Sequence, residues 1–338
     1  MFHSTVRVIY PLQNGTIVLR TELDWGRDIE SANIAADKTV HTFEISHDRP
    51  FLHFKPCIRD GWRFEWAQGS NKLLVMSNNS SQDFYPYFYS GQQGRMTGVI
   101  ELSSAHLQRN HRFRMYLPAG YDENGLKRYP VLYMHDGANL FFPEEAFLAQ
   151  EWRIDETLDM LDVMNLIDRT IVVGVHAGDR FFEYTQPGYE VFGRSLIDEL
   201  KVWVDDHFRT LTHASATAVM GSSLGGVVSF YLAWQYPEIF GNAACMSSTF
   251  SYRDDLIERV RREPQSPRNQ LKIYLDSGWP GDNYEVTFSM AGALLERGFQ
   301  HGKHLLHFAF PYAGHNEGAW SARSHLPIQH FFGKIRRA

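Results

Sequence analysis

Residues 217–226 read TAVMGSSLGG, an apolar run that suits a β-strand and ends abruptly in a Gly-x-Ser-x-Gly pattern; VVSFYL follows at 227–232. This order predicts a strand, a sharp turn and a helix, the arrangement called a nucleophile elbow. Ser223 would occupy the apex in a strained conformation, and Gly221 and Gly225 would avoid collisions of a Cβ atom with the neighbouring strand or helix. A chance match is the alternative for so short a pattern, but the flanking strand and helix favour a reactive Ser223.

The composition is that of an ordinary folded protein. Of the 338 residues, 43% are hydrophobic and 21% are charged, which allows two domains with a sizeable core. The net charge of −6 and the lack of a basic block argue against nucleic acid and an anionic membrane as partners. The chain shows neither a leader nor an apolar run of about 18 residues, so we expect a cytoplasmic protein. Cys57 and Cys245, far apart in the sequence, fit a reducing compartment.

Residues 1–94 alternate apolar and polar side chains in short segments, which is typical of β-strands. Turn-forming pairs separate the segments, and the glycine-rich stretch 91–94 marks a boundary. We therefore expect a small all-β sandwich that serves as an accessory domain. Its tryptophans, Trp25, Trp62 and Trp66, are expected in the core, with a sugar-stacking surface as the alternative. The expected strands lie within residues 16–20, 40–45, 62–66 and 73–76.

Residues 95–338 alternate apolar strands with amphipathic helices, which predicts a mostly parallel sheet flanked by helices on both faces. Eight strands with the candidate nucleophile after the fifth fit the α/β-hydrolase arrangement, and this part of the chain would be the catalytic domain. The expected strands are residues 99–102, 113–117, 131–134, 171–175, 216–220, 243–246, 271–275 and 305–310, and the last helix is expected at 320–332.

A serine hydroxyl needs a base to take its proton, and the base needs an acid to orient it. In this fold the order along the chain is serine, acid, histidine. His315 stands in the loop after the last apolar strand, where the base is required. Asp282 and Asp276 are the candidates for the acid, because both follow the strand at 271–275. Asp282 is preferred, since it lies beyond the strand end and can reach across to the histidine.

Attack on an ester carbonyl creates negative charge on its oxygen, which backbone N–H groups can stabilise. One donor would be the N–H of Leu224, directly after the candidate nucleophile. The second is expected from the loop after the strand at 131–134, with Gly137 or Ala138 as the donor. The remaining polar residues of that loop, His135 and Asp136, are expected to brace it rather than to react.

Three residues are predicted to contact substrate. Arg180 and Tyr184 stand in the loop after the strand at 171–175, and Trp279 stands in the loop that carries Asp282. An ion pair between Arg180 and Glu183 within the loop is the alternative interpretation of that stretch.

No cofactor is expected from the sequence. His301, His304 and His307 recur at a spacing of three, but a glycine and a strand lie within that stretch, so their rings would not converge on one metal. The chain contains neither Gly-x-Gly-x-x-Gly nor a phosphate-binding loop, which argues against a nucleotide.

On these residues the chain resembles the “Putative esterase” family of α/β-hydrolases, which includes feruloyl and acetylxylan esterases, S-formylglutathione hydrolases and enterochelin esterases. The resemblance covers about residues 97–338. It implies Ser223 as nucleophile, His315 as base and Asp282 as acid, although the acid follows Gly278 by one or two residues more than expected. The matching stretches are residues 112–121, 135–141, 180–184, 221–226, 278–282 and 314–315 with Trp320.

These observations predict a serine carboxylesterase that hydrolyses a polar or aromatic ester through an acyl-enzyme. Its substrate would be a small molecule such as a sugar-acyl ester, a feruloyl-type ester or a catecholate siderophore. The alternatives are an acyltransferase or thioesterase that uses the same triad, and a catalytically inactive binding protein. The sequence leaves the oligomeric state open, a homo-oligomer included.

Overall fold

The computed structural model describes residues 1–77, 80–263 and 270–334. They form two compact units. Unit 1 consists of residues 1–94 with the later segments 118–127 and 159–166, and unit 2 consists of the described residues of 95–117, 128–158 and 167–338. The chain therefore leaves unit 1 near the expected boundary and returns to it twice.

The first 94 residues of unit 1 fold into two β-sheets, one of four and one of five strands. Alternate side chains of both sheets, such as Val6, Phe43, Leu19 and Phe54, share one buried core. The four-stranded sheet has the order β4-β5-β1-β9, with β1 Phe2–Ile9, β4 Asn33–Ile34, β5 Val40–His47 and β9 Ser80–Phe84. The five-stranded sheet has the order β3-β2-β6-β7 with β8 beside β6, and comprises β2 Thr16–Thr21, β3 Asp24–Ile29, β6 Phe51–Asp60, β7 Arg63–Trp66 and β8 Lys72–Val75.

The three tryptophans of this unit lie outside its core, so that expectation is wrong. Trp62 is 89% exposed and Trp66 is 37% exposed. Trp66 pairs with Cys57 across β6 and β7, on the face opposite the core, and its ring meets Trp25 at an interplanar angle of 60°. The Arg20 guanidinium lies over this cluster, 5.2 Å from the Trp66 ring centre. Rings tilted in this way and covered by arginine do not form a flat stacking surface.

Glu123 explains why residues 118–127 belong to unit 1. Its carboxylate accepts hydrogen bonds from the Tyr10 hydroxyl at 3.0 Å and from the backbone N–H groups of Phe88, Tyr89 and Ser90 at 2.6 to 3.0 Å. Burial alone would raise the pKa of Glu123, but these donors outweigh it and lower the pKa below its usual value. The aromatic segment that precedes the boundary is thus tied to unit 1.

Unit 2 contains a nine-stranded sheet of order β10-β12-β14-β13-β15-β16-β17-β18, in which β11 pairs with β12. All eight expected strands are present, and the additional strand is the two-residue β10. The strands from β14 to β18 run parallel, while β12 is antiparallel to β14. Their bounds are β10 Arg95–Met96, β11 Ile100–Ser104, β12 Arg109–Leu117, β13 Val131–Met134, β14 Ile171–His176, β15 Thr217–Ser222, β16 Asn242–Met246, β17 Lys272–Trp279 and β18 Leu305–Pro311.

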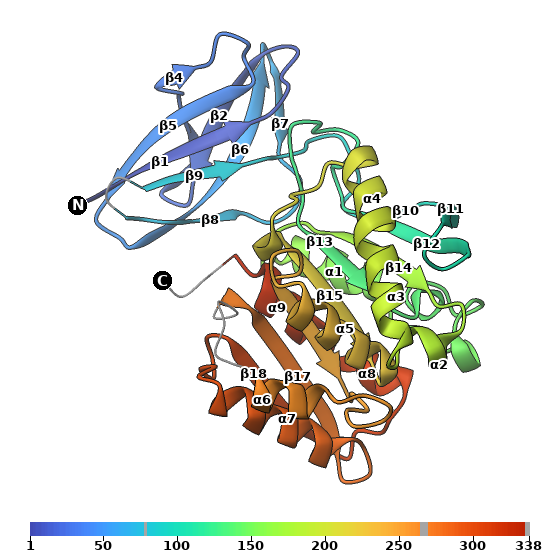
Figure 1. Ribbon diagram of the computed structural model, residues 1–338. Coiled ribbons are helices and arrows are strands. Elements are labelled where there is room, and N and C mark those ends of the chain that lie inside the picture. Colours follow the sequence, from blue (N-terminus) through green and yellow to red (C-terminus); the bar gives the residue numbers. More distant parts are fainter. Residues whose placement is uncertain (78–79, 264–269, 335–338) are drawn as a thin grey trace. The chain divides into compact units, whose positions relative to one another are not determined.

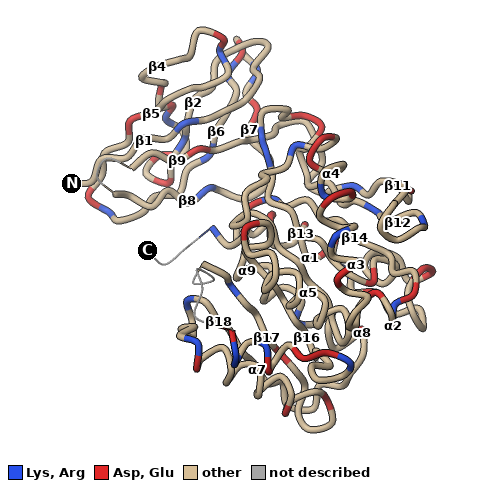
Figure 2. The backbone as a smooth tube through the Cα atoms, in the orientation of Figure 1, with Lys and Arg blue, Asp and Glu red and all other residues tan. Residues whose placement is uncertain are grey.

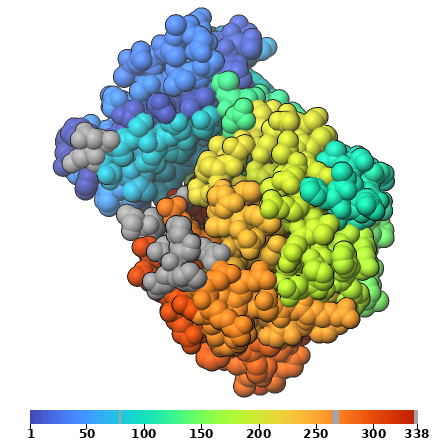
Figure 3. Space-filling model, viewed as in Figure 1, coloured from blue at the N-terminus to red at the C-terminus, as the bar shows by residue number. Residues whose placement is uncertain are grey.

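Helices flank this sheet, and Figure 1 shows α3, α4, α5, α6 and α7 on its near face. In the space-filling view these helices hide most of the sheet (Figure 3). The final helix expected at 320–332 is divided into α8 and α9 at Ser324. The helices are α1 Ile154–Val163, α2 Arg180–Glu183, α3 Gly188–Ser195, α4 Val202–His207, α5 Leu224–Gln235, α6 Leu256–Arg262, α7 Tyr284–Glu296, α8 Glu317–Arg323 and α9 His325–Phe332, with a π-helical turn at Leu196–Lys201 between α3 and α4.

Charged residues of both signs are scattered over the elements of both units (Figure 2). Within residues 1–77, 80–263 and 270–334, none of the helices combines the length and hydropathy of a membrane span. In the same ranges, histidine, cysteine and carboxylate side chains do not group in threes or more as metal ligands would.

The turn between β15 and α5 depends on close backbone contact. A Cβ atom on Gly221 would lie 2.6 Å from the backbone carbon and oxygen of Gly225, so only glycine fits there. Gly292, inside α7, has no atom within 4 Å of the corresponding position.

We expect opposite effects of alanine at these two glycines. Gly221→Ala should lower the free energy of unfolding by about 1–3 kcal/mol, because the backbone of the turn must move apart. Gly292→Ala should raise it by about 0.5–1 kcal/mol, because alanine restricts the unfolded chain and favours the helix. Denaturant titration of both variants measures the two values. Equal stability of Gly221→Ala and the wild type would contradict the tight turn.

Candidate active site

Ser223 lies at the turn between β15 and α5 with φ 56° and ψ −123°, a conformation that non-glycine residues rarely adopt. Its N–H donates to the Met246 carbonyl at 2.9 Å, which holds the strained residue against the end of β16. The N–H of Leu224, the first residue of α5, forms no hydrogen bond within the part of the chain that the structure describes. The turn therefore presents a hydroxyl and a free N–H donor side by side.

Asp282 and His315 form a hydrogen-bonded pair at the same edge of the sheet. His315 Nδ1 lies 2.6 Å from Asp282 Oδ1. Asp282 follows β17, His315 follows β18 and Ser223 follows β15, and these strands are parallel, so all three residues leave the sheet at its carboxyl edge. The Asp282 side chain is fully buried, whereas the His315 side chain is 35% exposed. The Asp282 carboxylate therefore orients the imidazole through Nδ1, while part of the His315 side chain remains accessible to solvent.

The environment of Asp282 favours its ionised form. Burial would raise the pKa of this carboxyl, but four hydrogen bonds outweigh burial and hold the pKa well below its usual range. Besides His315, the donors are the Ser247 hydroxyl and the backbone N–H groups of Gly278 at 2.7 Å and Asn283 at 2.8 Å. A carboxylate held in this way can stabilise positive charge on the imidazole.

Asp276, the other candidate for the acid, has hydrogen-bond partners other than His315. It is fully buried within β17. Its Oδ2 accepts hydrogen bonds from Arg323 Nε at 2.9 Å and from the Tyr274 hydroxyl at 2.8 Å. Asp276 is therefore committed to an ion pair with α8, and the structure brings Asp282 rather than Asp276 to the histidine.

The loop after β13 carries Gly137 and Ala138 in a single 3₁₀ turn. A Cβ atom on Gly137 would lie 2.5 Å from the backbone of Gly174 in β14, so this loop packs directly on the neighbouring strand. Among the described residues, no hydrogen bond uses the N–H of Ala138. Asp136, with φ 56° and ψ 47°, turns the chain at the start of the loop.

Arg180 and its neighbours form ion pairs other than the one considered from the sequence. Arg180 pairs with Asp136 through two hydrogen bonds of 2.8 Å and so fixes the loop after β13. Glu183 pairs instead with Arg109, at 2.8 and 2.7 Å, which overturns the pairing of Arg180 with Glu183. Tyr184 is fully buried, and its hydroxyl accepts a hydrogen bond from the Asp136 N–H at 3.2 Å. Tyr184 thus supports this loop and does not reach the surface where a substrate could contact it.

His135 is excluded as a reacting base. Its ring is buried against Tyr184 and Phe192, with centre-to-centre distances of 5.2 and 5.6 Å. Burial, together with the nearby Arg180 charge, lowers the pKa of His135 to about 3, so the ring is neutral and enclosed.

Trp279, in contrast, is accessible. It ends β17, just before the loop of Asp282, and is 48% exposed. Tyr312 follows β18 and is 89% exposed, and Phe181 in α2, after β14, is 60% exposed. Large aromatic side chains therefore stand exposed on three loops at the carboxyl edge of the sheet.

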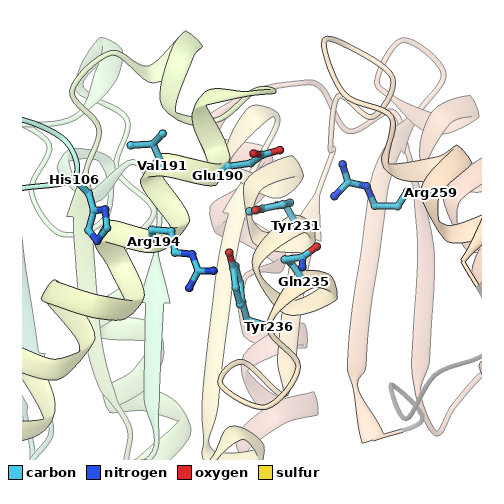
Figure 4. A pocket seen from close by; sticks show the side chains of 8 residues that line it. All are labelled: His106, Glu190, Val191, Arg194, Tyr231, Gln235, Tyr236 and Arg259. Carbon is cyan, nitrogen blue, oxygen red and sulfur yellow. The ribbon is translucent and has the colours of Figure 1, made fainter.

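Unit 2 has a separate hollow of about 450 Å³ lined by residues of α3, α5 and α6 (Figure 4). Arg194 and Arg259 border it, and the Arg194 guanidinium lies 5.3 Å from the centre of the Tyr236 ring. Tyr231, another lining residue, is two helical turns beyond Ser223 along α5, about 12 Å at the rise of an α-helix. Neither the serine nor the histidine described above lines this hollow.

The nucleophile elbow and the strand order place unit 2 among the esterases of the α/β-hydrolase type. Residues 104–324 match the family described as “Putative esterase”, so the chain belongs to this family and is a carboxylic-ester hydrolase. The uncharacterised protein YbbA of Bacillus subtilis (strain 168) is 28% identical over 212 residues, which are 58% of this chain and 82% of YbbA.

Two solved structures show the same fold. A ferulic acid esterase has a TM-score of 0.60 at 16% identity and covers 71% of this chain and 98% of its own. The enterobactin esterase FES from Shigella flexneri has a TM-score of 0.58 at 16% identity and covers 97% of this chain and 92% of its own.

We expect the two aspartates to respond differently to removal of their charge. Asp282→Asn should lower kcat by about 10³–10⁴-fold, because the imidazole loses its orienting carboxylate. Asp276→Asn should instead lower the free energy of unfolding by about 3–5 kcal/mol, since it leaves Arg323 buried without its counter-ion. Steady-state kinetics and denaturant titration of both variants measure these effects. A greater loss of kcat in Asp276→Asn would reverse the assignment.

Proposed function

We propose that the chain is a serine carboxylesterase in which Ser223, His315 and Asp282 act as the catalytic triad. In this proposal residues 95–338 are the catalytic domain and residues 1–94 an accessory domain. The single observation that supports it most directly is the 2.6 Å hydrogen bond between His315 and the buried Asp282, at the sheet edge where the strained Ser223 also lies.

The contacts at the sheet edge support an acyl-enzyme mechanism. Asp282 occupies Nδ1 of His315, which leaves Nε2 to take the Ser223 proton as the serine oxygen attacks the ester carbonyl. The N–H of Leu224, with that of Gly137 or Ala138, stabilises the negative charge on the carbonyl oxygen. His315 returns the proton to the departing alcohol. In the second half of the reaction, His315 takes a proton from water as the water oxygen attacks the acyl carbonyl, and then gives that proton to the departing Ser223 oxygen.

We propose a polar or aromatic ester as the substrate, of the sugar-acyl, feruloyl or catecholate siderophore type. The exposed rings of Phe181, Trp279 and Tyr312 support this, because aromatic side chains bury a flat acyl group well. The ferulic acid esterase and the enterobactin esterase among the structural neighbours agree with it. A soluble small-molecule ester requires neither nucleic acid nor a membrane as partner.

The nucleophile can be tested directly. A fluorophosphonate probe should label the wild type at Ser223 and leave Ser223→Ala unlabelled. Hydrolysis of p-nitrophenyl acetate by Ser223→Ala should fall by about 10⁴–10⁶-fold, because no other hydroxyl occupies the apex of the turn. Tryptic mass spectrometry locates the label. Undiminished hydrolysis by Ser223→Ala would refute the triad.

The exposed rings should govern the preference for aromatic esters. Trp279→Ala and Tyr312→Ala should each raise KM for a feruloyl ester about fivefold, roughly 1 kcal/mol of lost apolar contact, and leave KM for an acetyl ester unchanged. Phe288→Ala is the matched control, because Phe288 is 59% exposed on α7 and its ring faces His307 within β18. Equal effects on both esters would contradict a role in recognising the acyl group.

A further inference from the structure

A buried network of polar side chains lies behind the Asp282 carboxylate, on the side away from His315. Ser247 directly follows β16, is fully buried and has a φ of 42°. Its hydroxyl donates to Asp282 Oδ2. Trp320 and Arg323, both on α8, reach the same hydroxyl from the other side at 3.0 and 2.8 Å. Three segments far apart in sequence therefore meet at one oxygen atom.

The direction of each hydrogen bond at Ser247 follows from the partners. Trp320 Nε1 and Arg323 Nη2 can only donate, and a serine hydroxyl has one proton and two acceptor positions. The two donors fill both acceptor positions. The hydroxyl proton of Ser247 is therefore directed to Asp282, the one acceptor in the set.

Arg323 is held in place by a second carboxylate. Its Nε donates to Asp276 at 2.9 Å, its Nη1 donates to the Ala319 carbonyl at 3.1 Å, and its side chain is only 4% exposed. Its Nη2 remains 4.0 Å from Asp282 Oδ2, with Ser247 between them. Asp276 thus balances the charge of the guanidinium, which would otherwise be free to pair with Asp282 and compete with His315.

From this arrangement we infer that Ser247, Arg323 and Asp276 form a positioning unit that fixes the Asp282 carboxylate with Oδ1 toward His315. The inference rests on the proposed triad and adds to it a function for Asp276, which the sequence offered only as a rival acid. Ser247 is the link, because it is the one member that touches Asp282. Arg323 and Asp276 act through it.

The charged groups around Asp282 also define the effect of pH. They are His315 in front, Arg323 behind and Asp276 beyond Arg323. Ser247→Ala removes a donor to the carboxylate without changing any of these charges, so the pKa of Asp282 rises toward its ordinary value. The part of the activity loss that follows from protonation of Asp282, at strongly acidic pH, should then begin at a less acidic pH than in the wild type.

The test compares Ser247→Ala with Ser248→Ala. Ser248 is the next residue, is equally buried, and its hydroxyl has no hydrogen-bond partner among the described residues. With p-nitrophenyl acetate, Ser247→Ala should lose about 10–100-fold in kcat with KM within about twofold, and its loss of activity at strongly acidic pH should begin at a less acidic pH. Ser248→Ala should retain wild-type kcat and pH profile. Thermal unfolding of both variants separates loss of activity from loss of fold.

Arg323→Lys provides a second variant that keeps the charge beside Asp276. An ammonium group lacks the planar fork that reaches Asp276 and Ser247 together, so kcat should again fall with KM unchanged. Wild-type kcat in Ser247→Ala, or an equal loss in Ser248→Ala, would overturn the positioning unit. Ser223→Ala distinguishes this failure from failure of the triad: if it is inactive while Ser247→Ala is fully active, only the positioning unit is refuted.

Discussion

The hydrogen bond between Asp282 and His315 is the interaction on which the site depends. It joins the loop after β17 to the loop after β18, and it can form only because these strands are adjacent and parallel. Placing a carboxylate in a fully buried position is unfavourable unless several donors surround it. Here the donors come from the end of β17, the turn that follows it and Ser247. The same hydrogen bonds that make burial of the carboxylate tolerable also hold it in position beside His315.

The loop after β13 follows a similar principle. In the proposed mechanism it holds N–H groups toward a developing charge, and loops are by nature less rigid than strands. Arg180 anchors it through a bidentate pair with Asp136, and Gly137 lies in direct contact with β14. Buried Tyr184 supports the same turn. Arg180 and Tyr184, which the sequence suggests as substrate contacts, both hold this loop.

The sequence predicted well what depends on local pattern. The apolar strands of unit 2 and the sharp turn at Ser223 follow from periodicity and glycine spacing. It predicted poorly what depends on contacts between distant segments. Arg109 with Glu183 and Ser247 with Trp320 join residues 74 and 73 positions apart, and no local pattern signals such pairs. The outward-facing Trp66 was also missed, because an edge strand can place an aromatic ring on either face.

The positions of the three residues of the proposed triad along the chain also bear on how activity would arise during synthesis. The elbow serine follows the central strand β15, whereas the histidine follows β18, the last of the described strands. A nascent chain can therefore fold its first parallel strands around a serine that has no base beside it. If the proposed triad is the reacting set, reactivity toward esters requires the C-terminal strand to dock, and a partly synthesised chain would lack it.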